Sequence, residues 1–244
     1  GYNVAVGNYA LGAEDAHGRN VAIGYAALAA QNAGADAYNI GIGFVAGEII
    51  STGTYNILIG GLAGDALTTG GENVAIGHEA LSTEDGHGTN VAVGYRALKI
   101  LNAGVNAYNT AVGHKAGAEM TTGAYNTVLG AAALGAGVTT GDYNVAVGYY
   151  AGHAMTSCTN NTLVGSNAGD ALTSGGYNTA VGHNALSTED EHGKNVAIGR
   201  SALQAQDAGV DAYNVAVGFN AGISVLTGVQ NVLAGGLAGD ALTT

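Results

Sequence analysis

Short apolar stretches of the form Asn-Val-Ala-Val-Gly recur along the whole chain, the first at residues 3–7. Each begins at an asparagine, and successive anchoring asparagines are spaced 17 to 19 residues apart. Gly stands four places after every one, Ala seven places after, and Leu or Gly eight places after. Self-similarity at a fixed short period is typical of a repeat array. The 14 anchors are Asn3, Asn20, Asn39, Asn56, Asn73, Asn90, Asn109, Asn126, Asn144, Asn161, Asn178, Asn195, Asn214 and Asn231.

The hydrophobic pattern within each unit predicts a β-coil. A β-branched residue, a small residue, a second β-branched residue and then Gly indicate a short strand that ends at a tight turn. The Ala-Leu or Ala-Gly step that follows indicates a second short strand, and a polar loop returns the chain to the next Asn. We therefore predict an all-β fold, a parallel β-solenoid or β-roll of 14 coils with 17–19 residues per coil. Helical repeats are disfavoured, because so short a unit cannot hold a helix pair and a fixed Gly is costly in helices.

The repeat covers residues 1–244 and leaves nothing over for a separate domain, so we expect a single repeat array. Its loops come in four types that mostly follow one another in a fixed order, which indicates growth by block duplication. Neither end of the chain has a polar cap, which an isolated solenoid needs. We therefore expect the end coils to stack on further coils, within a longer fibre or between subunits.

Composition and charge narrow the class of protein. The chain has 43 Gly, no Pro and no Trp, with 47% hydrophobic and 10% charged residues, which excludes collagen and disorder. A net charge of −12 disfavours nucleic acid as a partner. No apolar run approaches the ~20 residues of a transmembrane helix, so we expect no membrane insertion. A thin stacked core explains why bulky side chains are scarce.

Tyrosine has a fixed place in the repeat, directly before the anchoring Asn. Equal register should align these rings along one edge, where stacked rings and stacked Asn amides form ladders that fix the register. A sugar-binding aromatic stripe is the alternative interpretation. The eight residues are Tyr2, Tyr38, Tyr55, Tyr108, Tyr125, Tyr143, Tyr177 and Tyr213.

The motif YN-[TV]-A-[VI]-G-xx-AL, followed by a short TTG-containing loop, resembles the tandem repeats of tail fibre domain-containing proteins from phages and bacteria. Its core NVAIGxxA, present at residues 20–27, is also similar to the head repeats of trimeric autotransporter adhesins. The resemblance covers all 14 units and implies a parallel β-roll in a homotrimer.

The most enzyme-like constellation is the acidic loop Glu84, Asp85 and His87, with counterparts Glu14, Asp15, His17 and Glu189, Asp190, His192. Three copies spread along an array do not make one cleft, so we interpret them as solvated turns and assign no catalytic, cofactor-binding or metal residue. Calcium is the alternative, because neighbouring coils pair Asp85 with Asn102 and Asp190 with Asp207, and hard cations bind several oxygens. Glycine clusters such as residues 41–47 lack the GK[ST] ending of a phosphate loop.

We therefore expect a structural repeat protein, and not an enzyme, that forms the shaft of an extracellular, cell-surface or virion fibre by stacking β-coils. We expect copies of this chain to associate with one another, by end-to-end stacking or as a homotrimer. The alternative is an adhesin or receptor-binding fibre that recognises surface glycans through lateral loops and the Tyr edge. Ice binding is disfavoured, because Thr does not recur at one strand position.

Overall fold

The computed structural model describes residues 1–14 and 17–244 and confirms the predicted all-β, parallel β-solenoid. It divides into two compact units, an N-terminal unit (Gly1–Ala124) and a C-terminal unit (Tyr125–Thr244). In both units each anchoring Asn directly precedes one strand. Among the described residues there is no helix long and apolar enough to cross a lipid bilayer.

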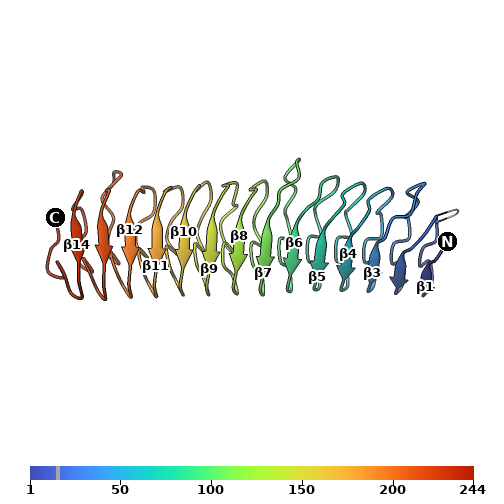
Figure 1. The fold of residues 1–244 in the computed structure, drawn as a ribbon, viewed down its shortest axis with the longest axis horizontal. Helices are drawn as coiled ribbons and strands as arrows, with labels where there is room; N and C mark the ends of the chain where they lie inside the picture. Colours follow the sequence, from blue (N-terminus) through green and yellow to red (C-terminus); the bar gives the residue numbers. More distant parts are fainter. Residues whose placement is uncertain (15–16) are drawn as a thin grey trace. The chain divides into compact units, whose positions relative to one another are not determined.

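The described residues of the N-terminal unit form seven three-residue strands that lie side by side in chain order and point the same way (Figure 1). Neighbours pair in parallel with identical repeat positions opposite each other, as in Val4 opposite Val21. The strands are β1 (Val4–Val6), β2 (Val21–Ile23), β3 (Ile40–Ile42), β4 (Ile57–Ile59), β5 (Val74–Ile76), β6 (Val91–Val93) and β7 (Thr110–Val112).

The C-terminal unit repeats this arrangement with seven further strands, again parallel and in register. The strands are β8 (Thr127–Leu129), β9 (Val145–Val147), β10 (Thr162–Val164), β11 (Thr179–Val181), β12 (Val196–Ile198), β13 (Val215–Val217) and β14 (Val232–Ala234).

The strands turn their β-branched residues outward. In β2 the central Ala22 is fully buried, whereas Ile23 is 38% exposed. The same pattern, a buried central residue between two less buried ones, holds for every strand from β2 to β13. The central residue, most often Ala but Leu58 in β4 and Leu163 in β10, therefore contributes to the core, and the flanking residues, mostly Val, Ile and Thr, form the outer face of the strands.

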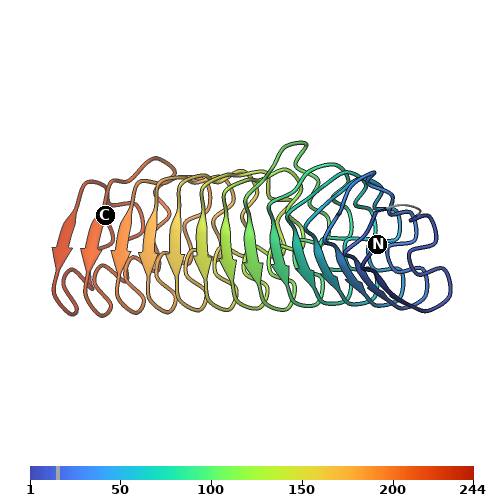
Figure 2. The ribbon, with the colours of Figure 1, turned by 45° about the vertical axis from the view of Figure 1, so that its right-hand side comes forward.

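The second short strand that we predicted in each coil is wrong. The residues after the conserved Gly form consecutive turns, in which every second residue has a positive φ, as at Ala26 (52°) and Leu28 (49°). Their backbone still bonds between coils: the Ala26 N–H donates to Asn8 O (2.9 Å) in the preceding coil, and the Leu28 N–H to Ala46 O (3.0 Å) in the following one. Figure 2 shows these turn segments closing each coil beside its strand. Stacking therefore satisfies the backbone without a regular second sheet.

Close stacking explains the Gly four places after each anchor. At Gly60, φ is 133°, and a Cβ added there would lie 2.5 Å from Gly77 O in the next coil. A side chain would therefore meet backbone that cannot move aside, so this Gly is required by the coil spacing as well as by the turn.

Core volume is shared between the eighth and eleventh repeat positions. At the eighth position of the coil that begins at Asn56, a Cβ on Gly64 would lie 2.8 Å from Leu58 Cδ2 and 2.9 Å from Leu67 Cδ1, because Leu67 at the eleventh position occupies that space. Where the eighth position is Leu, as at Leu28, the eleventh is usually Glu or Gln. The restriction of the eighth position to Leu or Gly therefore follows from how the eighth and eleventh side chains share the core volume.

Candidate functional site

No pocket is present in the part of the chain that the structure describes, residues 1–14 and 17–244. The side chains that recur with the repeat form three kinds of feature: a buried asparagine ladder, two exposed aromatic stripes, and acidic loops that contain histidine.

The anchoring asparagines form a ladder through each unit. The backbone N–H of each Asn donates to the Oδ1 of the Asn one coil earlier, at 2.8–3.1 Å, over six successive steps in each unit. The predicted Asn ladder is thus present. It lies in the core, where Asn20 and Asn161 are 0% and 1% exposed, and not along the exposed edge with the tyrosines.

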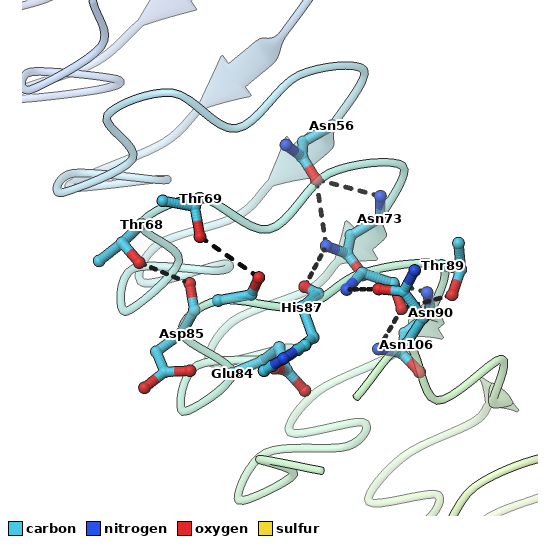
Figure 3. Close-up of polar contacts among 12 residues, drawn as sticks. Asn56, Thr68, Thr69, Asn73, Glu84, Asp85, His87, Thr89, Asn90 and Asn106 are labelled. Atoms are coloured by element: carbon cyan, nitrogen blue, oxygen red, sulfur yellow. Dashed lines mark hydrogen bonds and ion pairs between the residues drawn. The ribbon is translucent and has the colours of Figure 1, made fainter. Parts of the chain in front are cut away.

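The same amides close each coil. Asn161 Nδ2 donates to Gly175 O (3.0 Å), and Asn56 Nδ2 donates to Gly70 O (3.0 Å), in both cases 14 residues further along the chain. Figure 3 shows Asn56, Asn73 and Asn90 in the ladder, with Asn73 bonded to the His87 carbonyl. One buried side chain therefore sets both the stacking register and the path of the loop.

The tyrosines that precede the anchors form the first aromatic stripe, and two of its ring pairs are stacked as predicted. Tyr38 and Tyr55 have centroids 5.3 Å apart with planes 7° from parallel, and Tyr125 and Tyr143 are 4.9 Å apart at 2°. Where a coil lacks the Tyr, a cation can take its place: the Arg19 guanidinium lies 5.4 Å from the Tyr38 centroid. Stacked rings and cation–π contacts thus continue the stripe.

A second aromatic stripe lies five places after the anchors, and our sequence analysis missed it. Tyr25 stacks on Phe44 (5.5 Å), and Tyr95 stacks between His78 (5.8 Å) and His114 (5.2 Å). The signal was present as an aromatic, His or Arg at this position in many coils, but the mixture of residue types concealed it.

The acidic loop of the N-terminal unit brings its three predicted residues together. One potential ligand atom from each of Glu84, Asp85 and His87 lies within 4.8 Å of the others, and Figure 3 shows them on one loop beside the ladder. Glu84 is fully buried, Asp85 is exposed, and His87 is half-buried. Burial raises the pKa of the Glu84 carboxyl. The interpretation of these loops as fully solvated turns is therefore wrong for the glutamate.

The C-terminal unit repeats this loop. Glu189 is fully buried, and burial raises its pKa to about 7. Ligand atoms of Glu189, Asp190 and Asp207 lie within 4.8 Å of one another, so the predicted pairing of Asp190 with Asp207 across neighbouring coils is present. His192 Nδ1 lies 4.0 Å from Glu189 Oε1.

In the first copy of the loop, both oxygens of the glutamate accept hydrogen bonds. Glu14 Oε1 accepts the His17 N–H (3.1 Å), and Glu14 Oε2 accepts a hydrogen bond from Asn20 Nδ2 (3.3 Å). Asp15, the third predicted residue, lies outside the described residues. Both carboxylate oxygens of Glu14 are therefore satisfied by protein groups.

Cys158 is a buried free thiol. Desolvation raises its pKa to about 12, and the Cys158 carbonyl accepts a hydrogen bond from Asn144 Nδ2 (2.8 Å). A thiol held in this state is a packing residue and not a nucleophile.

Comparisons with protein-family models, with curated proteins and with solved structures find no match to this chain. The class of the protein, a parallel β-solenoid repeat protein, is therefore defined by the structure itself, and its function is inferred from the features above.

Proposed function

We propose that this chain is a structural repeat protein that builds the shaft of an extracellular or virion fibre by stacking β-coils. The observation that carries the proposal is the in-register ladder of buried asparagines, in which each coil presents to the next the same donors and acceptors. A structure of this kind extends by adding identical layers and needs no adapter. The extracellular or virion setting rests on the resemblance of the repeat to tail-fibre and adhesin repeats.

The strand edges support stacking. Within the described residues, β1 pairs only with β2, and β14 pairs only with β13. Val4 in β1 is 49% exposed and Val232 in β14 is 76% exposed. An unpaired strand edge with exposed apolar side chains is a template for another strand, and a second copy of this chain offers strands with the same repeat positions.

The outer sheet faces support lateral association, including a homotrimer. Seven strands spaced about 4.8 Å apart, each about 10 Å long, make a face of roughly 340 Å² per unit. Its Val, Ile and Thr side chains include Val112 (39% exposed) and Ile198 (38%). This extent lies within the roughly 300–600 Å² of the largest apolar patch on an ordinary monomer, and such patches often have a function.

Sedimentation velocity and negative-stain electron microscopy over a range of concentrations test the proposal. We expect end-to-end filaments that lengthen with concentration. A globular domain fused directly to Thr244 should stop growth, whereas the same domain on a long flexible linker should not. A monodisperse monomer at the highest concentration, with native circular dichroism, would contradict self-association.

Glycan recognition is the second candidate function, and the exposed aromatic stripes favour it. Tyr55 and Phe44 are 57% and 60% exposed. The stacked arrangement weighs against it, because a sugar packs on the face of a ring, and the pair Tyr38 and Tyr55 cover each other's faces. Register and stability are therefore the better-supported role of the stripe.

A glycan array with the double variant Tyr38→Ala/Tyr55→Ala separates these two roles. A structural stripe predicts a small loss of stability and no change in the array. Loss of a wild-type glycan signal at unchanged stability would favour recognition. Phe44→Ala, on the other stripe, is the control.

A further inference from the structure

Two glutamates are buried in the acidic loops with fewer hydrogen bonds than a buried carboxylate needs. The backbone of His87 and Ala103 lies near the Glu84 carboxylate, but neither Oε1 nor Oε2 accepts a hydrogen bond of good geometry. Glu189 Oε1 accepts the His192 N–H (3.2 Å), and Glu189 Oε2 has no partner. Both side chains are fully buried. An unpaired buried carboxylate costs several kcal/mol unless it is neutralised or paired with a cation.

A histidine with an unpartnered nitrogen faces each of these carboxylates. His87 Nδ1 is buried without a hydrogen bond and lies 3.7 Å from Glu84 Oε1. His192 Nδ1 is likewise unpartnered and lies 4.0 Å from Glu189 Oε1. These distances are too long for hydrogen bonds. They match the separation of about 3–4 Å between two ligand atoms that share a metal ion at bond lengths near 2.1 Å.

Coils with Gln at the same repeat position show what a fully satisfied side chain looks like there. Gln31 Oε1 accepts a hydrogen bond from Asn39 Nδ2 (2.6 Å), and Gln31 Nε2 donates to Ser51 O (3.1 Å). Gln206 makes the equivalent bonds to Asn214 Nδ2 (2.7 Å) and to Leu226 O (3.2 Å). A neutral amide thus completes the core by itself, whereas Glu84 leaves acceptors that a cation could fill.

We propose that the two loops at residues 84–87 and 189–192 each bind a divalent transition-metal ion of the Zn²⁺ class. The first site uses the clustered ligand atoms of Glu84, Asp85 and His87. The second uses the cluster of Glu189, Asp190 and, from the neighbouring coil, Asp207, and His192 Nδ1, 4.0 Å from Glu189 Oε1, supplies its imidazole. The proposal is independent of the fibre function, because it rests on the loops alone.

The ligand types indicate the metal. A set of two or three carboxylates with one imidazole suits Zn²⁺, Co²⁺ or Mn²⁺. Ca²⁺ binds six to eight oxygens, and these loops offer an imidazole and few oxygens. The calcium alternative from the sequence is therefore replaced by a transition-metal site at the same residues.

Isothermal titration of metal-free protein with Zn²⁺ at pH 7.5 tests the proposal directly. We expect high-affinity binding, and Co²⁺ substitution should give visible absorption bands that reveal the coordinated imidazole. The double variant Glu84→Gln/Glu189→Gln should lose two equivalents of Zn²⁺ and keep its fold, because Gln31 and Gln206 occupy this position natively.

A second pair of variants keeps the test decisive if the Gln variants fold poorly. His87→Ala/His192→Ala should weaken Zn²⁺ binding at least tenfold and abolish the Co²⁺ bands. The matched control His114→Ala/His183→Ala removes two histidines outside the acidic loops and should leave both readouts unchanged. Absence of Zn²⁺ binding at micromolar concentrations, equal losses in the control, or binding of Ca²⁺ but not Zn²⁺ would overturn the proposal.

Discussion

Removing one rung of the asparagine ladder should be among the most damaging single changes in the C-terminal unit. In Asn161→Ala, the buried Asn178 N–H loses its acceptor, Asn161 Oδ1 (2.8 Å), and the Gly175 carbonyl loses its donor, Asn161 Nδ2 (3.0 Å). Each buried polar group left without a partner costs about 1–3 kcal/mol, so the two together should cost about 2–6 kcal/mol. That is a large fraction of the net stability of a folded domain.

Urea denaturation followed by circular dichroism measures this loss. With a slope of about 2–3 kcal/mol/M, a central value of about 4 kcal/mol lowers the midpoint by about 1.3–2 M. The matched control is the neighbouring residue Thr162, whose side chain is exposed. Thr162→Val keeps the shape and the β-branching at the first position of β10, and should change the free energy of unfolding by under about 0.5 kcal/mol. A loss below about 1 kcal/mol in Asn161→Ala, at an unchanged slope, would refute the view that the ladder carries the register.

Three further changes probe the glycine, the buried carboxylate and the thiol. Gly60→Ala places a Cβ 2.5 Å from Gly77 O and should lower the free energy of unfolding, measured with urea, by at least about 3 kcal/mol. Gly34→Ala, where φ is 67° and the space around the Cβ is open, should lower it by about 1 kcal/mol. Equal losses in the two variants would contradict the argument that coil stacking requires Gly60. Burial raises the pKa of Glu189 to about 7, so folding favours the protonated form of this carboxyl. With a chelator present, the free energy of unfolding should therefore fall as pH rises from about 4.5 to 7 and then level off. Glu189→Gln should flatten this part of the profile, and an unchanged profile would count against the buried carboxylate. Cys158, whose pKa is raised to about 12, should have about a thousandfold less thiolate at pH 8 than an ordinary thiol. Iodoacetamide should therefore label Cys158 in the urea-unfolded chain and not in the folded chain. Rapid labelling of the folded chain would show that the thiol is not buried.

The parts of the fold that repeat in every coil could be predicted from the sequence. The anchoring Asn, the strand and the closing Gly have one residue type or class at each place, and β1 to β14 lie where that pattern puts them. The second strand was wrong for a physical reason. Residues such as Val45 (φ 50°) and Leu28 (φ 49°) adopt a positive φ that their residue types disfavour, because stacking on neighbouring coils supplies backbone partners for that geometry. No local pattern reveals a conformation that neighbouring coils impose.

The acidic loops were visible in the sequence, but their burial was not. A run such as Thr-Glu-Asp-Gly-His-Gly is polar throughout and predicts an exposed turn. Its Glu stands at the eleventh repeat position, which is buried both after Gly, as at Leu67, and after Leu, as at Glu84 and Glu189. The inward direction belongs to the position in the coil and not to the residue type. The sequence also concealed the outward direction of the Val and Ile side chains, because alternation alone does not say which face is buried.

The eleventh repeat position connects packing to the proposed metal sites. After Gly at the eighth position it carries an apolar residue, as at Leu67 and Met155, which are fully buried and fill the volume that the Gly leaves. After Leu the eleventh position usually carries Glu or Gln, although Leu101 after Leu98 shows that an apolar side chain also fits there. A polar side chain at this position needs partners for its polar atoms. Gln31 finds them within the protein, and Glu84 does not. The same buried position thus carries a satisfied Gln in one coil and, in another, a Glu beside a histidine. This predicts that Gln31→Glu, in a loop without an equivalent His, should destabilise the protein without creating a Zn²⁺ site; a gain of Zn²⁺ binding by that variant would show that the imidazole is not needed.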